Sequence, residues 1–389
     1  MKVTFVSNYI NHHQIPVSNV LYEHLGAEYT FIQTEPMEEE RIKLGWNPKE
    51  VPEYVKYAYE EPELCRQLIM DSDVVIWGGL EEEEMLRPRL QAGKPVIRYS
   101  ERLYKEAQWK AISPRGLRKK YLDHTRYRNA PVYMLCSGAF VASDFHIVRA
   151  YPNKMFKWGY FPECKEYDLD ALMAGKEEMS AGNGGKTEIL WAARFIDWKH
   201  PELVVQLAKE LKHQGKSFHI TMIGDGELRP KVEEMIAAEE LEDVISLTGS
   251  QTPVQVRTAM ENASVFLMTS DRKEGWGAVM NEAMNSGCAV VADRMEGATL
   301  FLMKQGENGF WYKDASAKCL ADLVGRLLED KKLRETIGRN AYRTIADLWN
   351  ARVAAERLLK MCETVAAGKE PEMLWTQGPC SKAEIIKER

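Results

Sequence analysis

The segment 274–292 combines two glutamates with two glycines at the point where a helix is predicted to begin. Gly275 and Gly277 allow a tight turn and a close approach of the backbone to a ligand. The free N–H groups and the positive dipole end of a helix favour an anionic group there, such as a diphosphate. Glu274 and Glu282 can both face that pocket, where carboxylates accept strong hydrogen bonds from sugar hydroxyls. The alternative is an amphipathic helix with two solvated glutamates, which the glycines make less favourable.

Two cations, Arg194 and Lys199, lie in a loop between a predicted strand and a predicted helix. Arginine offers phosphate oxygens a planar fork, and lysine offers them a point charge. Near a helix N-terminus, the two cations would stabilise the charge that builds up on a leaving diphosphate, without a metal ion. Two cations in a solvated loop are the simpler alternative.

A third turn, Gly224-Asp225-Gly226, also follows a strand and precedes a helix. It is a plausible nucleotide contact, and it equally suits a structural turn.

These segments need elements that place strand ends side by side. Short apolar runs alternate with helical segments, which predicts parallel sheets with right-handed crossovers. The predicted strands cover 3–7, 29–32, 73–77, 95–99, 132–136 and 154–158, and then 188–192, 218–223, 244–247, 264–268 and 288–292. The predicted fold class is therefore α/β, with two doubly wound Rossmann-like domains that face each other across a cleft and bind ligands beyond the carboxyl ends of their strands.

The domain boundary is predicted from a change in composition. Residues 173–186 contain four glycines and few residues to bury, which favours a linker or a loop. We expect an N-terminal domain over 1–165, a linker over 166–186 and a C-terminal domain over 187–348. Residues 349–389 would form a last helix and a polar tail.

Composition limits the possible classes of function. The 389 residues carry a net charge of −6, so no global positive field would attract nucleic acid. Seven cysteines without C-x-x-C spacing argue against a disulfide framework or a zinc cluster. Without a signal-peptide pattern or an apolar run of about 18 residues, we expect a cytoplasmic protein, with peripheral contact at the inner membrane face as an option.

One segment departs from the acidic average. Residues 115–128 hold six basic residues and one acidic residue, with Tyr and Leu interleaved. Such a helix suits an anionic membrane surface or a phosphate-bearing lipid acceptor, although a solvated helix face explains it as well.

Together, the three turn segments resemble the retaining glycosyltransferases of family 4, which share the GT-B architecture. The resemblance is concentrated in residues 188–312. The matching positions are the Glu-x7-Glu pair Glu274 and Glu282, the phosphate-binding Arg194 and Lys199, the Gly-Asp-Gly turn at 224–226, the turn at 306–309 and the final helix at 348–359.

The resemblance implies roles for these residues. Glu274 would contact the donor sugar and Glu282 the ribose, while the backbone of Gly275, Trp276 and Gly277 would hold sugar or phosphate oxygens. It also implies a donor sugar on UDP or GDP, no metal or other cofactor, and retention of the anomeric configuration. The last helix would cross back to the N-terminal domain, and the two halves would close on the donor.

The N-terminal half resembles the family only in outline. Many members have a glycine pair after the first strand, whereas the loop 8–16 of this chain contains His12 and His13. Many also carry a histidine after a middle strand, and this chain has Glu101 at the matching strand end. We therefore expect Glu101 or one of the histidines, His13 foremost, to reach the reacting sugar; each histidine alone also suits a loop or capping role.

The predicted function is a hexosyl-type glycosyltransferase acting on a glycan or lipid-linked acceptor, in bacterial surface polysaccharide or glycoconjugate biosynthesis. The donor would bind the C-terminal domain and the acceptor the N-terminal one. A nucleotide-sugar epimerase, which needs no acceptor, is one alternative. A non-catalytic scaffold that docks on a membrane through 115–128 is the other.

Overall fold

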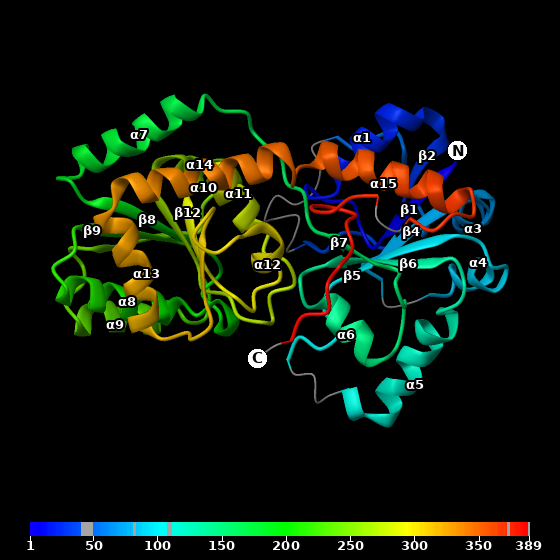
Figure 1. Ribbon diagram of the computed structural model, residues 1–389, viewed down its shortest axis with the longest axis horizontal. Coiled ribbons are helices and arrows are strands. Elements are labelled where there is room, and N and C mark those ends of the chain that lie inside the picture. Colours follow the sequence, from blue (N-terminus) through cyan, green and yellow to red (C-terminus); the bar gives the residue numbers. More distant parts are fainter. Residues whose placement is uncertain (40–49, 81–82, 107–110, 372–373, 388–389) are drawn as a thin grey trace. The chain divides into compact units, whose positions relative to one another are not determined.

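The computed structural model describes residues 1–39, 50–80, 83–106, 111–371 and 374–387. Contacts divide the chain into two compact units, one formed by residues 1–163 with 348–389 and the other by residues 164–347. Each unit contains one parallel sheet flanked by helices (Figure 1). The predicted class of two doubly wound α/β domains is confirmed.

The first unit is built on a seven-stranded sheet in the order β3-β2-β1-β4-β5-β6-β7. Apart from the short edge strand β3, the strands are largely buried and rich in apolar residues, and all of them pair in parallel register, as expected for a sheet covered on both faces. They are β1 (Val3–Ser7), β2 (Tyr29–Gln33), β3 (Val55–Tyr57), β4 (Val74–Gly78), β5 (Val96–Ser100), β6 (Val132–Ser137) and β7 (Met155–Trp158).

Helices connect these strands and cover the sheet. They are α1 (Ile15–Leu25), α3 (Pro62–Asp71), α4 (Arg87–Gln91), α5 (Pro114–Asp123), α6 (Val141–Ile147) and α15 (Ala351–Ala366), with the short turns η1 (Gly26–Glu28) and η3 (Thr125–Tyr127). The last helix, α15, packs against α1 at the other end of the chain (Figure 1). The C-terminal helix is therefore part of the first unit.

The polar tail that follows α15 extends the first sheet. Phe156 and Lys382 form an antiparallel bridge, and Lys157 N donates to Ser381 O over 2.7 Å. The tail therefore pairs with the edge strand β7 and satisfies its backbone groups, a pairing that composition alone does not reveal.

The second unit is built on a six-stranded parallel sheet in the order β10-β9-β8-β11-β12-β13. Its strands are β8 (Thr187–Ala192), β9 (Phe218–Ile223), β10 (Ile245–Gly249), β11 (Val265–Met268), β12 (Ala289–Asp293) and β13 (Phe310–Tyr312). Its helices are α7 (Leu169–Gly182), η4 (Asp197–Lys199), α8 (Pro201–His213), α9 (Arg229–Ala238), α10 (Pro253–Asn262), α11 (Val279–Asn285), α12 (Thr299–Leu302), α13 (Ala317–Glu329) and α14 (Lys331–Asp347). The loops after β8, β9 and β11 carry the predicted donor residues.

The glycine-rich stretch 173–186, for which we expected a linker or loop, is largely helical. Asp168 caps α7 by accepting hydrogen bonds from Asp170 N and Ala171 N. Lys176 is buried and donates to Met260 O over 2.7 Å, which anchors the helix against its unit. Capping and this anchor outweigh the low helix propensity of the glycines.

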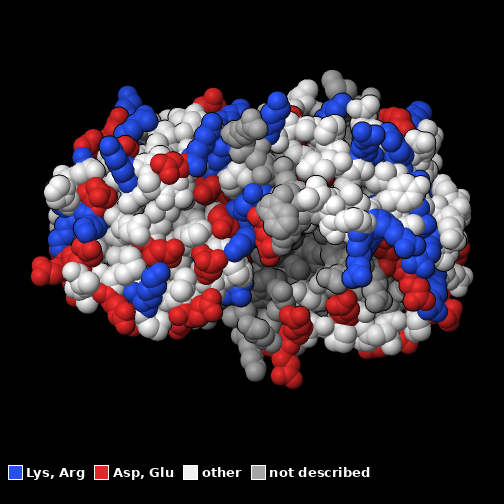
Figure 2. Space-filling model, turned by 90° about the horizontal axis from the view of Figure 1, so that it is seen from below, with Lys and Arg blue, Asp and Glu red and all other residues white. Residues whose placement is uncertain are grey.

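Charged residues are mixed on the surface. On the face seen in Figure 2, Lys and Arg side chains lie interspersed with Asp and Glu. All seven cysteines are free thiols. Within the part of the chain that the structure describes, no helix is both long and apolar enough to cross a membrane.

Candidate functional site

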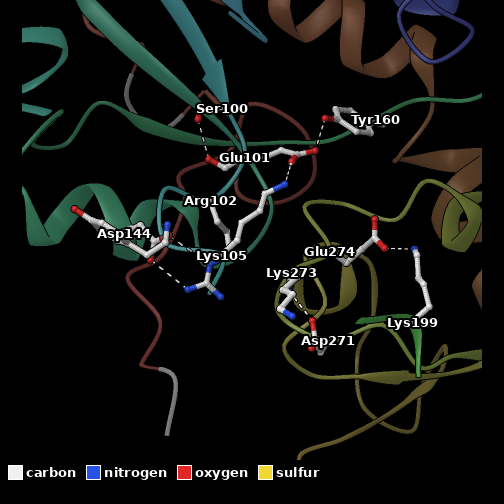
Figure 3. Close-up of polar contacts among 11 residues, drawn as sticks. Ser100, Glu101, Arg102, Lys105, Asp144, Tyr160, Lys199, Asp271, Lys273 and Glu274 are labelled. Carbon is white, nitrogen blue, oxygen red and sulfur yellow. Dashed lines mark hydrogen bonds and ion pairs between the residues drawn. The ribbon is translucent and has the colours of Figure 1, made fainter. Parts of the chain in front are cut away.

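Lys199 and Glu274, 75 residues apart in the sequence, form an ion pair in the second unit (Figure 3). Lys199 ends η4 after β8, and Glu274 follows β11, the strand next to β8 in the sheet. Their side chains are 13% and 18% exposed, so both remain reachable from solvent. The structure thus brings together two of the predicted catalytic residues.

Backbone contacts hold the two loops against each other. Thr269 Oγ1 donates to Lys199 O over 2.5 Å, and Asp271 N donates to Trp198 O over 3.0 Å. These hydrogen bonds hold the backbone of the loop that carries Lys199, and the ion pair with Glu274 holds its ammonium.

Arg194, the second predicted cation, is exposed. Its guanidinium lies 5.7 Å from the centre of the Trp198 ring, a cation–π contact. It follows the same strand as Lys199, from which it is five residues away, and it can still reach an anion at this strand end.

The turn at 224–226 packs tightly against the loop that carries Arg194. Gly224 and Gly226 have φ of +136° and +153°, and an added Cβ would lie 1.9 Å from Ala193 O and 2.6 Å from Phe195 O, respectively. Phe195 N donates to Asp225 O over 2.9 Å. These glycines therefore have a structural role, and the exposed Asp225 carboxylate approaches Arg229 at 3.5 Å.

The turn at 275–277 is equally crowded. Gly277 has φ of +75°, and an added Cβ there would lie 2.5 Å from Glu296 Oε1. A Cβ on Gly297 would lie 1.8 Å from Gly275 O. Trp276 is fully buried, and its indole Nε1 donates to Asn281 Oδ1 over 2.9 Å. The Trp276 side chain is therefore a core residue, and only its backbone can contact a ligand.

Helix α11 covers Val279–Asn285 and begins beyond Gly275 and Gly277, where we expected a helix to start, because residues 275–277 form the turn. Its seven residues carry a small dipole. Positive charge at this strand end therefore comes mainly from side chains, among them Lys199 and Arg194.

Glu282 lies on α11 beside a buried arginine. Burial raises the pKa of Glu282, while the charges of Arg257 and Lys165 act to lower it. Arg257 Nη1 donates to the Glu282 carbonyl over 3.1 Å. The Glu282 carboxylate accepts no hydrogen bond from the described residues and is available to a hydroxyl donor.

His200, which the sequence did not single out, lies next to Lys199. Its Nε2 is 3.2 Å from Asp271 Oδ2 and its Nδ1 is 3.4 Å from Glu202 Oε1. Hydrogen bonds to Asp271 and Glu202 raise the pKa of His200 to about 10. His200 is therefore a cation at neutral pH.

Glu296 is the second residue that sequence reasoning missed. It is fully buried, and its Oε2 accepts from Ala298 N, Thr299 N and Thr299 Oγ1 at 2.8–3.1 Å. Its Oε1 is buried without a hydrogen-bond partner among the described residues. Burial, and then the charge of Glu274, raise the pKa of Glu296 well above its usual range.

Glu101, in the first unit, follows the carboxyl end of β5. Its carboxylate is 2.5 Å from Lys105 Nζ and accepts a hydrogen bond of 2.5 Å from Tyr160 (Figure 3). Tyr160 follows β7 and was not predicted, because a single tyrosine after a strand carries no motif. It fixes one side of the Glu101 carboxylate.

His13 lies beside the same tyrosine. The His13 ring stacks on the Tyr160 ring with centroids 5.8 Å apart. The centroid of the His12 ring lies 3.8 Å from that of the His13 ring. Burial, and then the charge of His12, lower the pKa of His13 to about 3. The structure therefore gathers Glu101 and His13 around Tyr160, with His13 neutral.

A cavity of about 530 Å³ lies beyond the carboxyl ends of β4 and β5 in the first unit. Glu101 and Tyr160 line it together with Arg98, Lys119 and Lys120. The volume of this cavity lies within the range of small-molecule sites, roughly 300–1,000 Å³.

The basic segment 115–128 forms α5 and η3. None of the described residues of α5 is buried, and Leu117, Tyr121 and Leu122 are 41%, 56% and 40% exposed. Ile112, just before the helix, is 76% exposed. The helix thus presents apolar side chains among basic ones.

Comparisons with known proteins point to one class of enzyme. Residues 176–344, which include both members of the Lys199–Glu274 pair, match the family model described as Glycosyl transferases group 1. The alpha-D-kanosaminyltransferase of Streptomyces kanamyceticus is 28% identical over 196 residues, which are 50% of each chain. The amylovoran biosynthesis glycosyltransferase AmsK of Erwinia amylovora is 26% identical over 183 residues, 46% of this chain and 45% of that one.

A third relative is the N,N'-diacetylbacillosaminyl-diphospho-undecaprenol alpha-1,3-N-acetylgalactosaminyltransferase of Campylobacter jejuni. It is 28% identical over 190 residues, 46% of this chain and 49% of that one. The chain thus spans about half the length of the curated relatives it matches.

Solved structures match most of the chain. Anabaena HepE in complex with UDP has a TM-score of 0.68 at 14% identity, covering 93% of this chain and all of that one. The same protein with UDP-glucose gives a TM-score of 0.60 at 14% identity, covering 95% of this chain and 99% of that one. At this identity the likeness concerns the fold, which is GT-B.

Proposed function

Because residues 176–344 match the glycosyl transferases of group 1, we propose that the chain is a member of that family and that it transfers a hexose from a nucleotide-diphosphate sugar to a glycan or lipid-linked acceptor with retention of configuration. The observation that supports this most directly is the convergence of Lys199 and Glu274 beside the turn 275–277. A cation and a carboxylate at one strand end suit a donor with an anionic diphosphate and a sugar rich in hydroxyls.

The proposed chemistry divides between these residues. As the bond between the anomeric carbon and the diphosphate oxygen breaks, negative charge grows on the leaving diphosphate. Lys199 and Arg194 stabilise that charge without a metal ion, and Glu274 orients the sugar by accepting hydrogen bonds from its hydroxyls. Glu282 binds the ribose, since its carboxylate is free to accept hydrogen bonds.

We propose UDP as the nucleotide of the donor. HepE, whose fold this chain shares, was solved with UDP and with UDP-glucose. A thermal-shift comparison of UDP with GDP tests the base, because at equal concentration the nucleotide that binds the folded state more tightly raises the melting temperature more.

For the acceptor side we propose the cavity that Glu101 lines. Glu101 suits the reacting centre better than His13, because the Glu101 carboxylate faces the cavity, whereas the low pKa of His13 leaves it an uncharged ring stacked on Tyr160. The acceptor class follows the relatives, one named for amylovoran biosynthesis and one for a diphospho-undecaprenol acceptor. We therefore propose a role in surface polysaccharide or glycoconjugate assembly.

The test is a Glu274→Gln substitution, which keeps the shape of the side chain and removes its charge. With UDP-glucose as donor, we expect release of UDP to fall at least about a hundredfold, because an interaction made in the transition state is lost. Glu234→Gln, on the exposed face of α9 in the same unit, is the matched control and should leave turnover unchanged.

Two outcomes would contradict the proposal. Undiminished UDP release by folded Glu274→Gln would remove this residue from the mechanism. An isomerised sugar nucleotide, formed from donor alone and detected by NMR, would instead show an epimerase.

We also propose that α5 touches an anionic membrane surface, since its exposed Leu117, Tyr121 and Leu122 lie among basic residues. Each basic residue near such a surface contributes about 1 kcal/mol, so Arg115→Gln/Arg118→Gln should weaken binding to phosphatidylglycerol vesicles roughly thirtyfold. Equal flotation of the variant and the native protein with these vesicles would refute this contact.

A further inference from the structure

A second cavity, of about 400 Å³, lies in the first unit near the amino end of β7. Met155, the first residue of β7, lines it, as do Pro152 and Asn153 just before that strand. Glu101 follows the carboxyl end of β5, and β5, β6 and β7 run parallel. The two cavities therefore lie at opposite ends of the strands of this sheet, one near their amino ends and the other beyond their carboxyl ends.

The lining of this cavity is basic. Arg128, Arg149, Lys382 and His146 contribute to it, and none of the described lining residues is acidic. All four are exposed, and none forms an ion pair or side-chain hydrogen bond with the residues that the structure describes. In a chain with a net charge of −6, the gathering of the three uncompensated cations Arg128, Arg149 and Lys382 favours an anionic ligand.

The backbone around the cavity adopts a demanding conformation. Arg149, Tyr151 and Asn153 have φ of 55°, 48° and 59°, the left-handed region that residues other than glycine rarely adopt. Tyr151 is fully buried, and its hydroxyl lies 2.7 Å from His124 Nδ1. Because this anchor holds the loop, Arg149 projects from a fixed position.

The C-terminal tail supplies another wall. Lys382, Ala383 and Ile385 line the cavity, and Ala383 N donates to Met155 O over 3.0 Å. Farther along, Ile386 N donates to Ser143 Oγ over 2.8 Å. The cavity therefore depends on the docked tail, and a ligand inside it should hold the tail in place.

We propose that this cavity, lined by Arg128, Arg149 and Lys382, binds a phosphate group carried on a small organic moiety. Two guanidinium groups offer planar forks that match phosphate oxygens, and the ammonium adds a third charge. Pro152, Met155 and Ile385 provide apolar contact for the organic part. The volume falls within the range of small-ligand pockets, roughly 300–1,000 Å³. This site goes beyond the proposed transfer reaction and does not depend on it.

A phosphate on an organic carrier has two sources, a soluble phosphorylated metabolite or the headgroup of an anionic lipid. The experiment measures hydrogen exchange of residues 149–155 and 378–387 in the full-length protein, with UDP present to occupy the proposed donor site. The probes are glycerol 1-phosphate, phosphatidylglycerol vesicles and phosphatidylcholine vesicles. Protection of both segments by glycerol 1-phosphate indicates a soluble ligand, and protection by phosphatidylglycerol vesicles alone indicates a lipid headgroup.

The variants are chosen to preserve the fold. Arg149→Asn/Lys382→Gln removes two charges and keeps a residue that tolerates the left-handed backbone at position 149. Lys318→Gln/Lys332→Gln removes two charges from exposed positions in the second unit and is the matched control. We expect the dissociation constant of the protecting probe to rise at least tenfold in the first variant and to stay unchanged in the control.

Arg128→Gln changes a residue in a separate segment and gives an independent check. It should weaken binding of the same probe. Absence of protection by both the soluble probe and the phosphatidylglycerol vesicles would overturn the proposal. Equal protection of the cavity variant and its control would overturn it too, because binding would then not depend on these cations.

Discussion

The buried carboxyl of Glu296 should make the stability of the second unit depend on pH. Burial and the charge of Glu274 raise the pKa of Glu296 well above that of an exposed glutamate. The folded state therefore binds this proton more tightly than the unfolded chain does. The resulting stabilisation is fully present below the unfolded pKa of about 4.3 and is lost as the pH rises through the folded pKa.

The size of the effect follows from linkage. Between the two pKa values the unfolded chain carries one proton fewer than the folded protein, so the free energy of unfolding falls by about 1.4 kcal/mol per pH unit. From pH 5 to pH 7 this amounts to at most about 2.7 kcal/mol. Glu296→Gln removes the titration, while its amide oxygen can accept the three hydrogen bonds now made by Oε2.

Urea denaturation of the native protein and of Glu296→Gln at pH 5, 6 and 7 tests this reasoning. We expect the variant to gain stability relative to the native protein as the pH rises, by up to about 1.4 kcal/mol per pH unit. Glu234→Gln, which is exposed, should follow the native protein at every pH. Parallel curves for the native protein and Glu296→Gln would show that the buried carboxyl does not hold a proton.

Three further outcomes are expected. Gly224→Ala should lower the free energy of unfolding, measured by urea denaturation, by about 3 kcal/mol or more, because the added Cβ would lie 1.9 Å from Ala193 O. Gly215→Ala, whose Cβ would meet nothing within 4 Å, should lower it by only about 1 kcal/mol. His200→Gln should lower the melting temperature at pH 7, because the pKa of His200 in the folded protein is raised to about 10. The difference in melting temperature between native protein and variant should be largest below the unfolded pKa of about 6.5 and should disappear as the pH rises through 10. Lys199→Met should weaken UDP binding in calorimetry roughly 10- to 150-fold, the loss of one charge-assisted hydrogen bond, and an unchanged affinity would place the diphosphate elsewhere.

The long elements could be predicted because their signals are strong. Strands β8 and β9 are largely buried and rich in apolar residues, and α8 and α10 begin with proline at the first helical position. The strands β3 and β13, with three residues each, were missed because they are too short to show a periodic pattern. Helix α7 was mistaken for a linker because its anchor, the buried ammonium of Lys176, is a tertiary contact that composition does not show.

Residues of the candidate site could be predicted where a side chain of suitable chemistry follows a predicted strand. Lys199 and Glu274 both follow parallel strands, so their proximity follows from the rule that the carboxyl ends of such strands share one edge. Glu296 could not be found in this way, because its importance comes from burial beneath Gly277. Tyr160 was not predicted either, because its hydrogen bond to Glu101 links two segments 59 residues apart in the sequence.

The raised pKa of Glu296 also bears on the proposed binding of an anion. Glu274 and Glu296 interact electrostatically with each other and with the single ammonium of Lys199. If both carboxyls were charged, the pair would outweigh that ammonium and repel a diphosphate. Burial and the charge of Glu274 raise the pKa of Glu296 and so favour its neutral form, in which Lys199 faces one carboxylate instead of two. The cation at His200 is balanced separately by Asp271 and Glu202, so the charges that we propose for the diphosphate are the ammonium of Lys199 and the exposed guanidinium of Arg194.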